Sequence, residues 1–318
     1  MIHIYCSRNS DKMMAEIKNE CSKAITSLLT LKCSPFLVQL HTATSSNTTS
    51  ILQQMNKALQ YLQALKPSLE TRQFISACFN TTPALFPTWL RSLAVPEPKA
   101  SFACLSKYSL ISFVLQNGPD VGIRDGNRIE EGDEKKAYDF IVGNIMPRAL
   151  TKNILTKAIQ SPNPFMTAEA LKLLLAILGR FEKLKNDAFI SGDVNERIFR
   201  HLAKKLALRI PDLQVILSIR SKFDLNVDVQ KIENRLYVHH NFVTFNLCKT
   251  LKMYACLFPE AFRNVKFDWI KLLSDSSKTF LLTPLSLQHC LLDTMASIQI
   301  CMEVRLFAFA LSLHQCII

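Results

Sequence analysis

The sequence predicts an all-α protein, specifically an irregular helical solenoid of the HEAT or armadillo type, and three observations lead to this prediction. The 318 residues include only seven glycines, too few for a turn-rich all-β fold or a glycine-rich nucleotide loop. Leucine greatly outnumbers valine; leucine suits a helix, whereas valine is restricted at χ1 and favours strands. The hydrophobic fraction of 48% excludes disorder for most of the chain.

Proline junctions mark the helix starts that we expect along the chain. At five places a residue that can cap a helix stands directly before proline. This order suits a helix start, because the cap oxygen accepts an orphan N–H and proline at the first position has none. The junctions predict many short helices joined by tight corners, and they are Ser34-Pro35, Thr82-Pro83, Ser161-Pro162, Asn163-Pro164 and Thr283-Pro284.

Apolar residues recur every three or four positions between these junctions, as they do on one face of a helix. Residues 51–65 and 198–208 show such stripes, the second with basic residues on its other side. The segment 170–178 is apolar almost all round apart from Lys172. This pattern predicts a helix that its neighbours cover on several sides.

The spacing of three later prolines indicates a repeat. Pro164, Pro211 and Pro259 are 47 and 48 residues apart, near the length of HEAT and armadillo units. Each interval can hold a helix pair that buries its apolar stripe on the next pair, so we predict one helical array over residues 1–318. An irregular helical bundle of the same composition is the alternative.

Two segments fall outside the helical pattern. Residues 42–50, TATSSNTTS, form a predicted polar loop, and residues 117–136 form a glycine-rich, charged and exposed one. The second segment lacks the GK[ST] that a phosphate-binding loop requires. Read as a calcium loop from Asp120, it places Gly122 and Arg124 where acidic ligands are needed.

No constellation in the chain predicts catalysis. The ten cysteines contain no CxxC pair, and we expect them to be reduced core residues. His239-His240 and His289-Cys290 are the densest ligand-type pairs, but adjacent helical residues point about 100° apart. HExxH and GxSxG are absent. We therefore expect no enzyme activity, cofactor, metal site or small-molecule substrate, and we find no convincing membrane span.

The basic residues are the more informative set. The chain has 38 Lys and Arg against 26 Asp and Glu, a net charge of +12, which favours an anionic partner. Many of them recur along predicted helix edges, where a solvated helix face is the ordinary explanation. Jointly they predict a salt-sensitive contact with RNA phosphates. The candidate contacts are Arg148, Lys152, Lys157, Arg200, Lys204, Lys205, Arg209, Lys249 and Lys252.

Two tryptophans are better explained by packing than by ligand stacking. Trp89 and Trp269 stand in FPTWL and FDWI, beside other large apolar residues. No aromatic platform interleaves with the basic residues, so base-specific RNA recognition is not predicted.

Several segments, taken in order, resemble the nucleolar pre-ribosomal-associated protein 1 family. Residues 147–178 resemble a family segment in which a proline–basic–leucine helix start precedes paired LTxAL and ALxLLxxIL motifs. Residues 210–215 are similar to its LPD helix start. From about Leu59 to Leu292 the segments keep the family's order and approximate spacing; the others are residues 83–90, 105–115, 251–254, 258–259, 265–269 and 284–292.

The resemblance implies a function and a location. Members of this family are very large helical-repeat proteins of the nucleolus that act as scaffolds in early assembly of the large ribosomal subunit. By resemblance, the partners are pre-ribosomal RNA and other assembly factors. The chain resembles only an internal part of the family's N-terminal region, and it ends in the apolar LFAFALSLHQCII. We therefore expect a fragment or truncated product, since a finished array has a polar capping repeat.

The function predicted is thus a non-catalytic scaffold in nucleolar pre-rRNA processing, with basic helix edges on RNA phosphates. The alternative is a HEAT-like adaptor or transport module that binds peptide partners in a concave groove. Concentration in the nucleolus would favour the scaffold over the adaptor.

Overall fold

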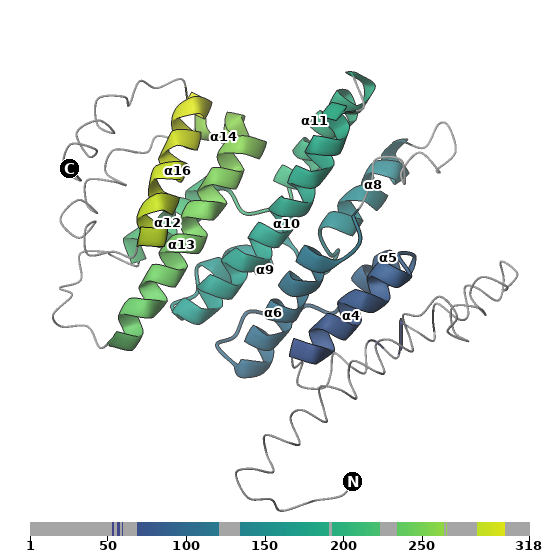
Figure 1. Cartoon of the computed structure of the whole chain (residues 1–318), viewed down its shortest axis with the longest axis horizontal. Helices are drawn as coiled ribbons and strands as arrows, with labels where there is room; N and C mark the ends of the chain where they lie inside the picture. Colours follow the sequence, from purple (N-terminus) through teal and green to yellow (C-terminus); the bar gives the residue numbers. More distant parts are fainter. Residues whose placement is uncertain are drawn as a thin grey trace, which may run out of the picture.

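In the computed structural model, the residues described are 53, 56, 57, 59, 69–120, 134–190, 193–222, 234–263, 265 and 285–302. Their regular secondary structure is entirely helical, and no strand occurs among them. The all-α prediction is therefore confirmed for this part of the chain. Figure 1 shows the helices lying roughly side by side along the long axis of the molecule.

Five of the described helices form a row in which each contacts the next. We call them the row helices: α4 (Leu69–Thr81), α6 (Phe102–Asn117), α10 (Pro164–Ile190), α13 (Asn234–Leu257) and α16 (Leu285–Met302). The neighbouring contacts join segments far apart in sequence, so the row is a tertiary arrangement rather than a set of hairpins.

Shorter helices pack against the row. Helices α8 (Glu134–Ile145), α9 (Lys152–Ile159) and α11 (Asp193–Ala207) contact α10. Helices α12 (Leu213–Lys222) and α14 (Pro259–Arg263) contact α13, and α14 also contacts α16. Helix α5 (Leu85–Ser92) contacts α8, which in turn contacts α11.

Helix α10 is the centre of the core. Residues 170–178 include leucine, isoleucine and alanine side chains on most sides of the helix that are at most 4% exposed, while Lys172 is half-buried. Contacts with α6, α13, α9 and α11 explain why this helix needs apolar residues almost all round. Phe181 extends the core by stacking on Phe199 at 4.7 Å and on Phe258 at 5.9 Å between ring centroids.

The proline rule for helix starts holds at one of the junctions that the structure describes. Helix α10 begins at Pro164, and the Asn163 side chain accepts from the N–H groups of Phe165 and Met166 at 3.0 and 3.2 Å. The prediction was wrong at Pro162, which lies in the turn before that cap. The remaining starts at Pro35 and Pro284 lie outside the described residues.

The prediction of a helix start at Thr82-Pro83 was also wrong. A tight turn follows Thr82, whose carbonyl accepts from the N–H of Leu85 at 3.0 Å, and α5 begins only at Leu85. Two helices begin instead at hydroxyl caps without proline. Ser101 caps α6 and Thr151 caps α9, each accepting a backbone N–H at 3.3 Å.

The repeat spacing corresponds to real helix pairs. The interval from Pro164 to Pro211 holds α10 and α11, and the interval from Pro211 to Pro259 holds α12 and α13. The order is reversed, however: the long row helix comes first in one interval and second in the other. Proline spacing therefore marks the length of a unit and not a repeated packing arrangement.

Two local predictions need adjustment, and a third is confirmed. Both ends of the predicted loop 117–136 are helical, because Asn117 ends α6 and Glu134 begins α8; residues 121–133 lie outside the described residues. Leu208, assigned to the apolar stripe of 198–208, lies in the turn after α11 and is 77% exposed. Trp89 is fully buried against Phe79, with 5.2 Å between ring centroids, as predicted. The loop 42–50, most of residues 51–65 and Trp269 lie outside the described residues.

Candidate nucleic-acid interface and polar groove

Positive charge is concentrated in the described helices. Basic residues outnumber acidic ones by roughly two to one there, whereas the two are equally frequent in the rest of the chain. The net charge of +12 thus belongs to the described part of the chain. Excess charge of one sign on a folded surface attracts anions of the opposite sign.

Most of the predicted RNA contacts gather on α9, α11 and the segment that joins α8 to α9. We call this set the outer basic surface. Helix α11 contacts α8 directly, and Arg209 at its end donates to the Pro147 carbonyl at 3.0 Å, beside Arg148. The exposed members of the outer basic surface are Arg148, Lys157, Arg200 and Lys204.

Three half-buried members of the outer basic surface bind other parts of the protein. Lys152 pairs with Asp212 at 2.7 Å, and Lys205 pairs with Asp139 at 2.8 Å. Arg209 is half-buried, and burial and the neighbouring Arg148 lower its pKa. These residues tie helices together, so their contribution to an RNA contact is smaller than the sequence prediction implied.

The remaining two predicted contacts lie elsewhere, on row helix α13. Lys252 reaches across to α16 and pairs with Asp293 at 2.6 Å, a bond that raises the pKa of the lysine. Lys249 is exposed and lies over the Phe245 ring, with 4.2 Å from its Nζ to the centroid. The nine predicted residues therefore do not form one continuous surface.

Lys249 lines a cavity of about 470 Å³ that crosses four row helices, and we call this cavity the polar groove. Helix α4 contributes Arg72, α10 contributes Glu169 and Lys172, and α13 contributes Asn246 and Lys249. Helix α6 supplies Ser109, Ser112 and Gln116, with Phe113 as an apolar wall.

Charges in the polar groove are only partly compensated. Lys172 pairs with Glu169 on its own helix at 2.8 Å and lies 4.5 Å over the Phe242 ring of α13. Arg72 donates from Nη1 to the Ser109 hydroxyl at 2.8 Å. Because three cations face one carboxylate, the lining carries an excess of positive charge.

Two polar atoms of the groove residues are buried without a hydrogen-bond partner among the described residues. They are Nε of Arg72, a donor, and Oε2 of Glu169, an acceptor. A buried polar group without a partner costs about 1–3 kcal/mol, so such atoms in a natural protein need an explanation.

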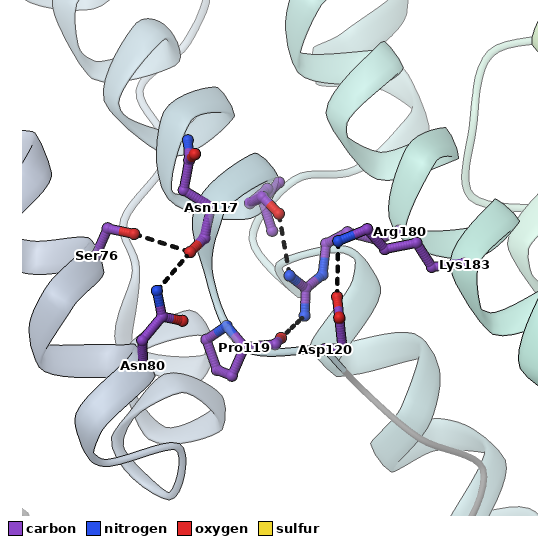
Figure 2. Close-up of polar contacts among 8 residues, drawn as sticks. Ser76, Asn80, Asn117, Pro119, Asp120, Arg180 and Lys183 are labelled. Atoms are coloured by element: carbon purple, nitrogen blue, oxygen red, sulfur yellow. Dashed lines mark hydrogen bonds and ion pairs between the residues drawn. The ribbon is translucent and has the colours of Figure 1, made fainter.

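Arg180, which the sequence groups with Lys183 and Lys185 in a basic series, has a different role. It is 7% exposed and donates to the Leu115 and Pro119 carbonyls at 3.0 and 2.7 Å (Figure 2). Its guanidinium also lies 4.6 Å from the Phe86 ring. Burial lowers the pKa of Arg180 to about 10, against a smaller opposing effect of Asp120.

Helix α4 holds the same end of α6 from the other side. The hydroxyl of Ser76 and the amide of Asn80 both donate to the Asn117 carbonyl, at 2.9 and 3.0 Å (Figure 2). Carbonyls in the last turn of a helix have no partner within it. We call Arg180, Ser76, Asn80 and the end of α6 the α6 junction; its role is structural.

Of the two ligand-type pairs of the sequence, the side chains of His239 and His240 lie outside the described part of the structure. Within the described part, no group of three His, Cys, Asp or Glu lies close enough together to hold a metal ion. His289 is exposed on α16, whereas Cys290 is buried beside Cys248. A hydrogen bond with Cys248 is the main cause that lowers the pKa of Cys290 to about 7.

Comparisons with protein-family models, curated proteins and solved structures give no match for this chain. Within the described residues, none of the helices combines the length and apolar character needed to cross a bilayer.

Sequence reasoning missed Arg72 and Lys172 as site residues. A signal existed for Lys172: it is the single charge in a segment that is otherwise apolar all round, and it stands three residues after Glu169. No signal existed for Arg72, because only the packing of α4 against α6 brings it to the groove.

Proposed function

We propose that the chain is a non-catalytic helical scaffold that binds RNA backbones through the outer basic surface. The single observation that carries this proposal is the exposure of Arg148, Lys157, Arg200 and Lys204, together with the bond from Arg209 to the Pro147 carbonyl that brings the end of α11 to the α8–α9 connection. Basic side chains on a rigid helical face bind phosphates without reading sequence.

The architecture proposed for this scaffold is an irregular solenoid. The described row helices contact their neighbours in the row, and the shorter helices cover them. An array in which each unit packs mainly on the next can extend without a single central core, which suits a large binding surface. The reversed order of long and short helices in successive intervals makes the proposed solenoid irregular.

The resemblance to the nucleolar pre-ribosomal-associated protein 1 family supports a particular setting. In that setting the RNA is pre-ribosomal RNA, other partners are large-subunit assembly factors, and the chain concentrates in the nucleolus. Nucleolar localisation of a tagged chain tests this part of the proposal; a diffuse cytoplasmic distribution would contradict it.

Binding of a single-stranded RNA at increasing salt tests the RNA contact. We expect the logarithm of the association constant to fall with the logarithm of salt concentration, with a slope of about −0.7 per phosphate neutralised. Lys157→Glu combined with Lys204→Glu should weaken binding at least about tenfold, because two cations become anions.

Lys99→Glu is the matched control, since Lys99 is exposed in the connection between α5 and α6, in a different part of the chain from the outer basic surface. Equal losses of affinity in Lys99→Glu and in Lys204→Glu alone, each a single charge reversal, would show that binding depends on net charge alone. Absence of binding at low salt would overturn the RNA contact altogether.

A further inference from the structure

We propose that the polar groove binds an acidic peptide segment of a partner protein. This inference is independent of the outer basic surface, because the groove lies across α4, α6, α10 and α13 and uses none of the exposed residues of α9 and α11. Its volume of about 470 Å³ lies in the range of sites that hold a defined ligand.

The cations select an anionic ligand. Arg72, Lys172 and Lys249 come from three different row helices, and Glu169 is the carboxylate among the lining residues. Glu169 offsets only one of the three positive charges. A ligand that carries carboxylates would find a cation on α4, on α10 and on α13, so an extended ligand lying across the row satisfies more of them than a compact ion does.

The other polar groups select a ligand that also donates hydrogen bonds. Glu169 Oε2 accepts only, and it has no partner among the described residues. The exposed side-chain amide of Gln116 offers donors and an acceptor in the same lining, whereas the buried Asn246 amide already donates to the Phe242 carbonyl at 2.9 Å. Each peptide unit offers one N–H and one C=O, and thus matches both kinds of group.

These features favour a peptide over a nucleic acid. Phosphates along an RNA backbone are acceptors and fully charged, so the Glu169 carboxylate would repel them. Carboxylates of a peptide are separated by neutral backbone, which lets an N–H face Glu169 while acidic side chains face the lysines. Phe113 and Leu175 give the apolar portions of such side chains a surface to pack on.

Fluorescence anisotropy with two probes of equal charge tests the proposal. The probes are a fluorescein-labelled peptide of alternating Glu and Ser and a labelled oligouridylate with the same number of negative charges. We expect Lys249→Glu to weaken binding of the peptide at least about tenfold, because a groove cation becomes an anion. Lys204→Glu, on the outer basic surface, should change peptide binding less than about twofold.

Oligouridylate should respond in the opposite way, with a greater loss of affinity for Lys204→Glu than for Lys249→Glu. This pattern separates the two sites. A result that contradicts peptide binding in the polar groove therefore need not contradict the RNA contact, and a result against the RNA contact need not contradict peptide binding. Lys249→Gln, which removes the charge without reversing it, should give an intermediate loss of peptide affinity. Unchanged thermal unfolding would show that either variant is folded.

Three outcomes would overturn the peptide proposal. The first is peptide affinity that Lys249→Glu and Lys249→Gln leave unchanged. The second is displacement of the peptide by oligouridylate, together with a loss of oligouridylate affinity in Lys249→Glu. This result would make the groove a nucleic-acid site. The third is inorganic phosphate that competes as well as the peptide does at equal concentration, which would indicate a site for small anions.

Discussion

Helix α10 carries two cations about two turns apart that have opposite roles. Arg180 is 7% exposed and bonds to two main-chain carbonyls at the α6 junction. The Lys172 side chain is 35% exposed and pairs with a carboxylate in the polar groove. The acceptor makes the difference. The two carbonyls that Arg180 binds are fixed parts of the main chain, so these bonds stabilise the fold. Glu169 has a second carboxylate oxygen, so its pair with Lys172 can accommodate a ligand.

The largest expected effect comes from breaking the α6 junction. Arg180→Met keeps much of the side-chain volume but leaves the Leu115 and Pro119 carbonyls without their donor. We expect a loss of about 3 kcal/mol in the free energy of unfolding, because both hydrogen bonds have a charged donor. Urea denaturation measures it.

Lys183→Met is the matched control for Arg180→Met. Lys183 pairs with Asp120 at the same junction, but both side chains are more than half exposed. Its loss should cost less than about 0.5 kcal/mol. An Arg180→Met protein as stable as its control would contradict a structural role for the guanidinium.

Gly118, beside the α6 junction, and Gly179, within α10, provide the next test. A Cβ on Gly118 would lie 2.7 Å from the Val114 carbonyl oxygen and 2.8 Å from the Phe86 ring, so Gly118→Ala must displace one of them. We expect a destabilisation of about 2 kcal/mol, typical of overpacking. A Cβ on Gly179, within α10, meets nothing within 4 Å.

Gly179→Ala should therefore stabilise the protein by about 0.5–1 kcal/mol through helix propensity. Thermal denaturation of the two variants side by side checks the difference in sign. If both alanines were tolerated equally, the packing at the end of α6 would be looser than these distances require.

Tyr108 on α6 carries a polar group that we expect to lower the stability of the fold rather than raise it. Its hydroxyl is buried and has no partner among the described residues. Tyr108→Phe should stabilise the protein by about 1 kcal/mol at neutral pH, because an unpaired polar group leaves the interior. A destabilised Tyr108→Phe protein would show that the hydroxyl has a partner after all. Calorimetric unfolding gives the change.

The same residue predicts a pH dependence. Burial raises the pKa of Tyr108 in the folded state, and the nearby Cys104 raises it further. The unfolded chain thus releases this proton first, near pH 10, and stability should fall as the pH rises above that value. Burial also raises the pKa of Cys78 to about 11, so its thiol adds to the alkaline loss from about pH 9. Urea unfolding at neutral and alkaline pH should show a smaller loss for Tyr108→Phe.

A small effect on stability is expected in the polar groove. Lys249→Gln removes an exposed cation that lies over Phe245 and should cost less than about 1 kcal/mol. Small stability changes combined with large changes in ligand affinity would separate the polar groove from the α6 junction. A loss comparable to that of Arg180→Met, measured in urea, would make Lys249 a structural residue instead.

Much of the helical architecture could be predicted from local pattern, and particular residues show why. The segment 170–178 is apolar on nearly all sides, and the structure buries it in the middle of the row. Asn163-Pro164 starts a helix because both residues act within the first turn. Thr82-Pro83 does not, because proline also suits the second position of a tight turn, and the turn from Thr82 to Leu85 delays α5.

The candidate site was predictable only in part. Exposed Arg200 and Lys204 follow from the stripe of α11, since an amphipathic helix determines which residues face away from its apolar side. Lys152, Lys205 and Lys252 were placed in the same class, but their carboxylate partners lie at least 41 residues away in sequence. The spacing of residues within a few helical turns cannot indicate pairs that are this far apart in the sequence.

The sequence by itself determined the helical class, the most buried helix and the excess of positive charge, because each depends on composition or on spacing within a few turns. Tertiary structure alone decided which cations are structural and which line a cavity. Arg72, Glu169 and Lys249 meet at the polar groove because α4, α6, α10 and α13 pack in that order. Arg180 is removed from water by a helix end 61 to 65 residues earlier in the chain. Long-range packing sets burial, and burial decides what a charge can do.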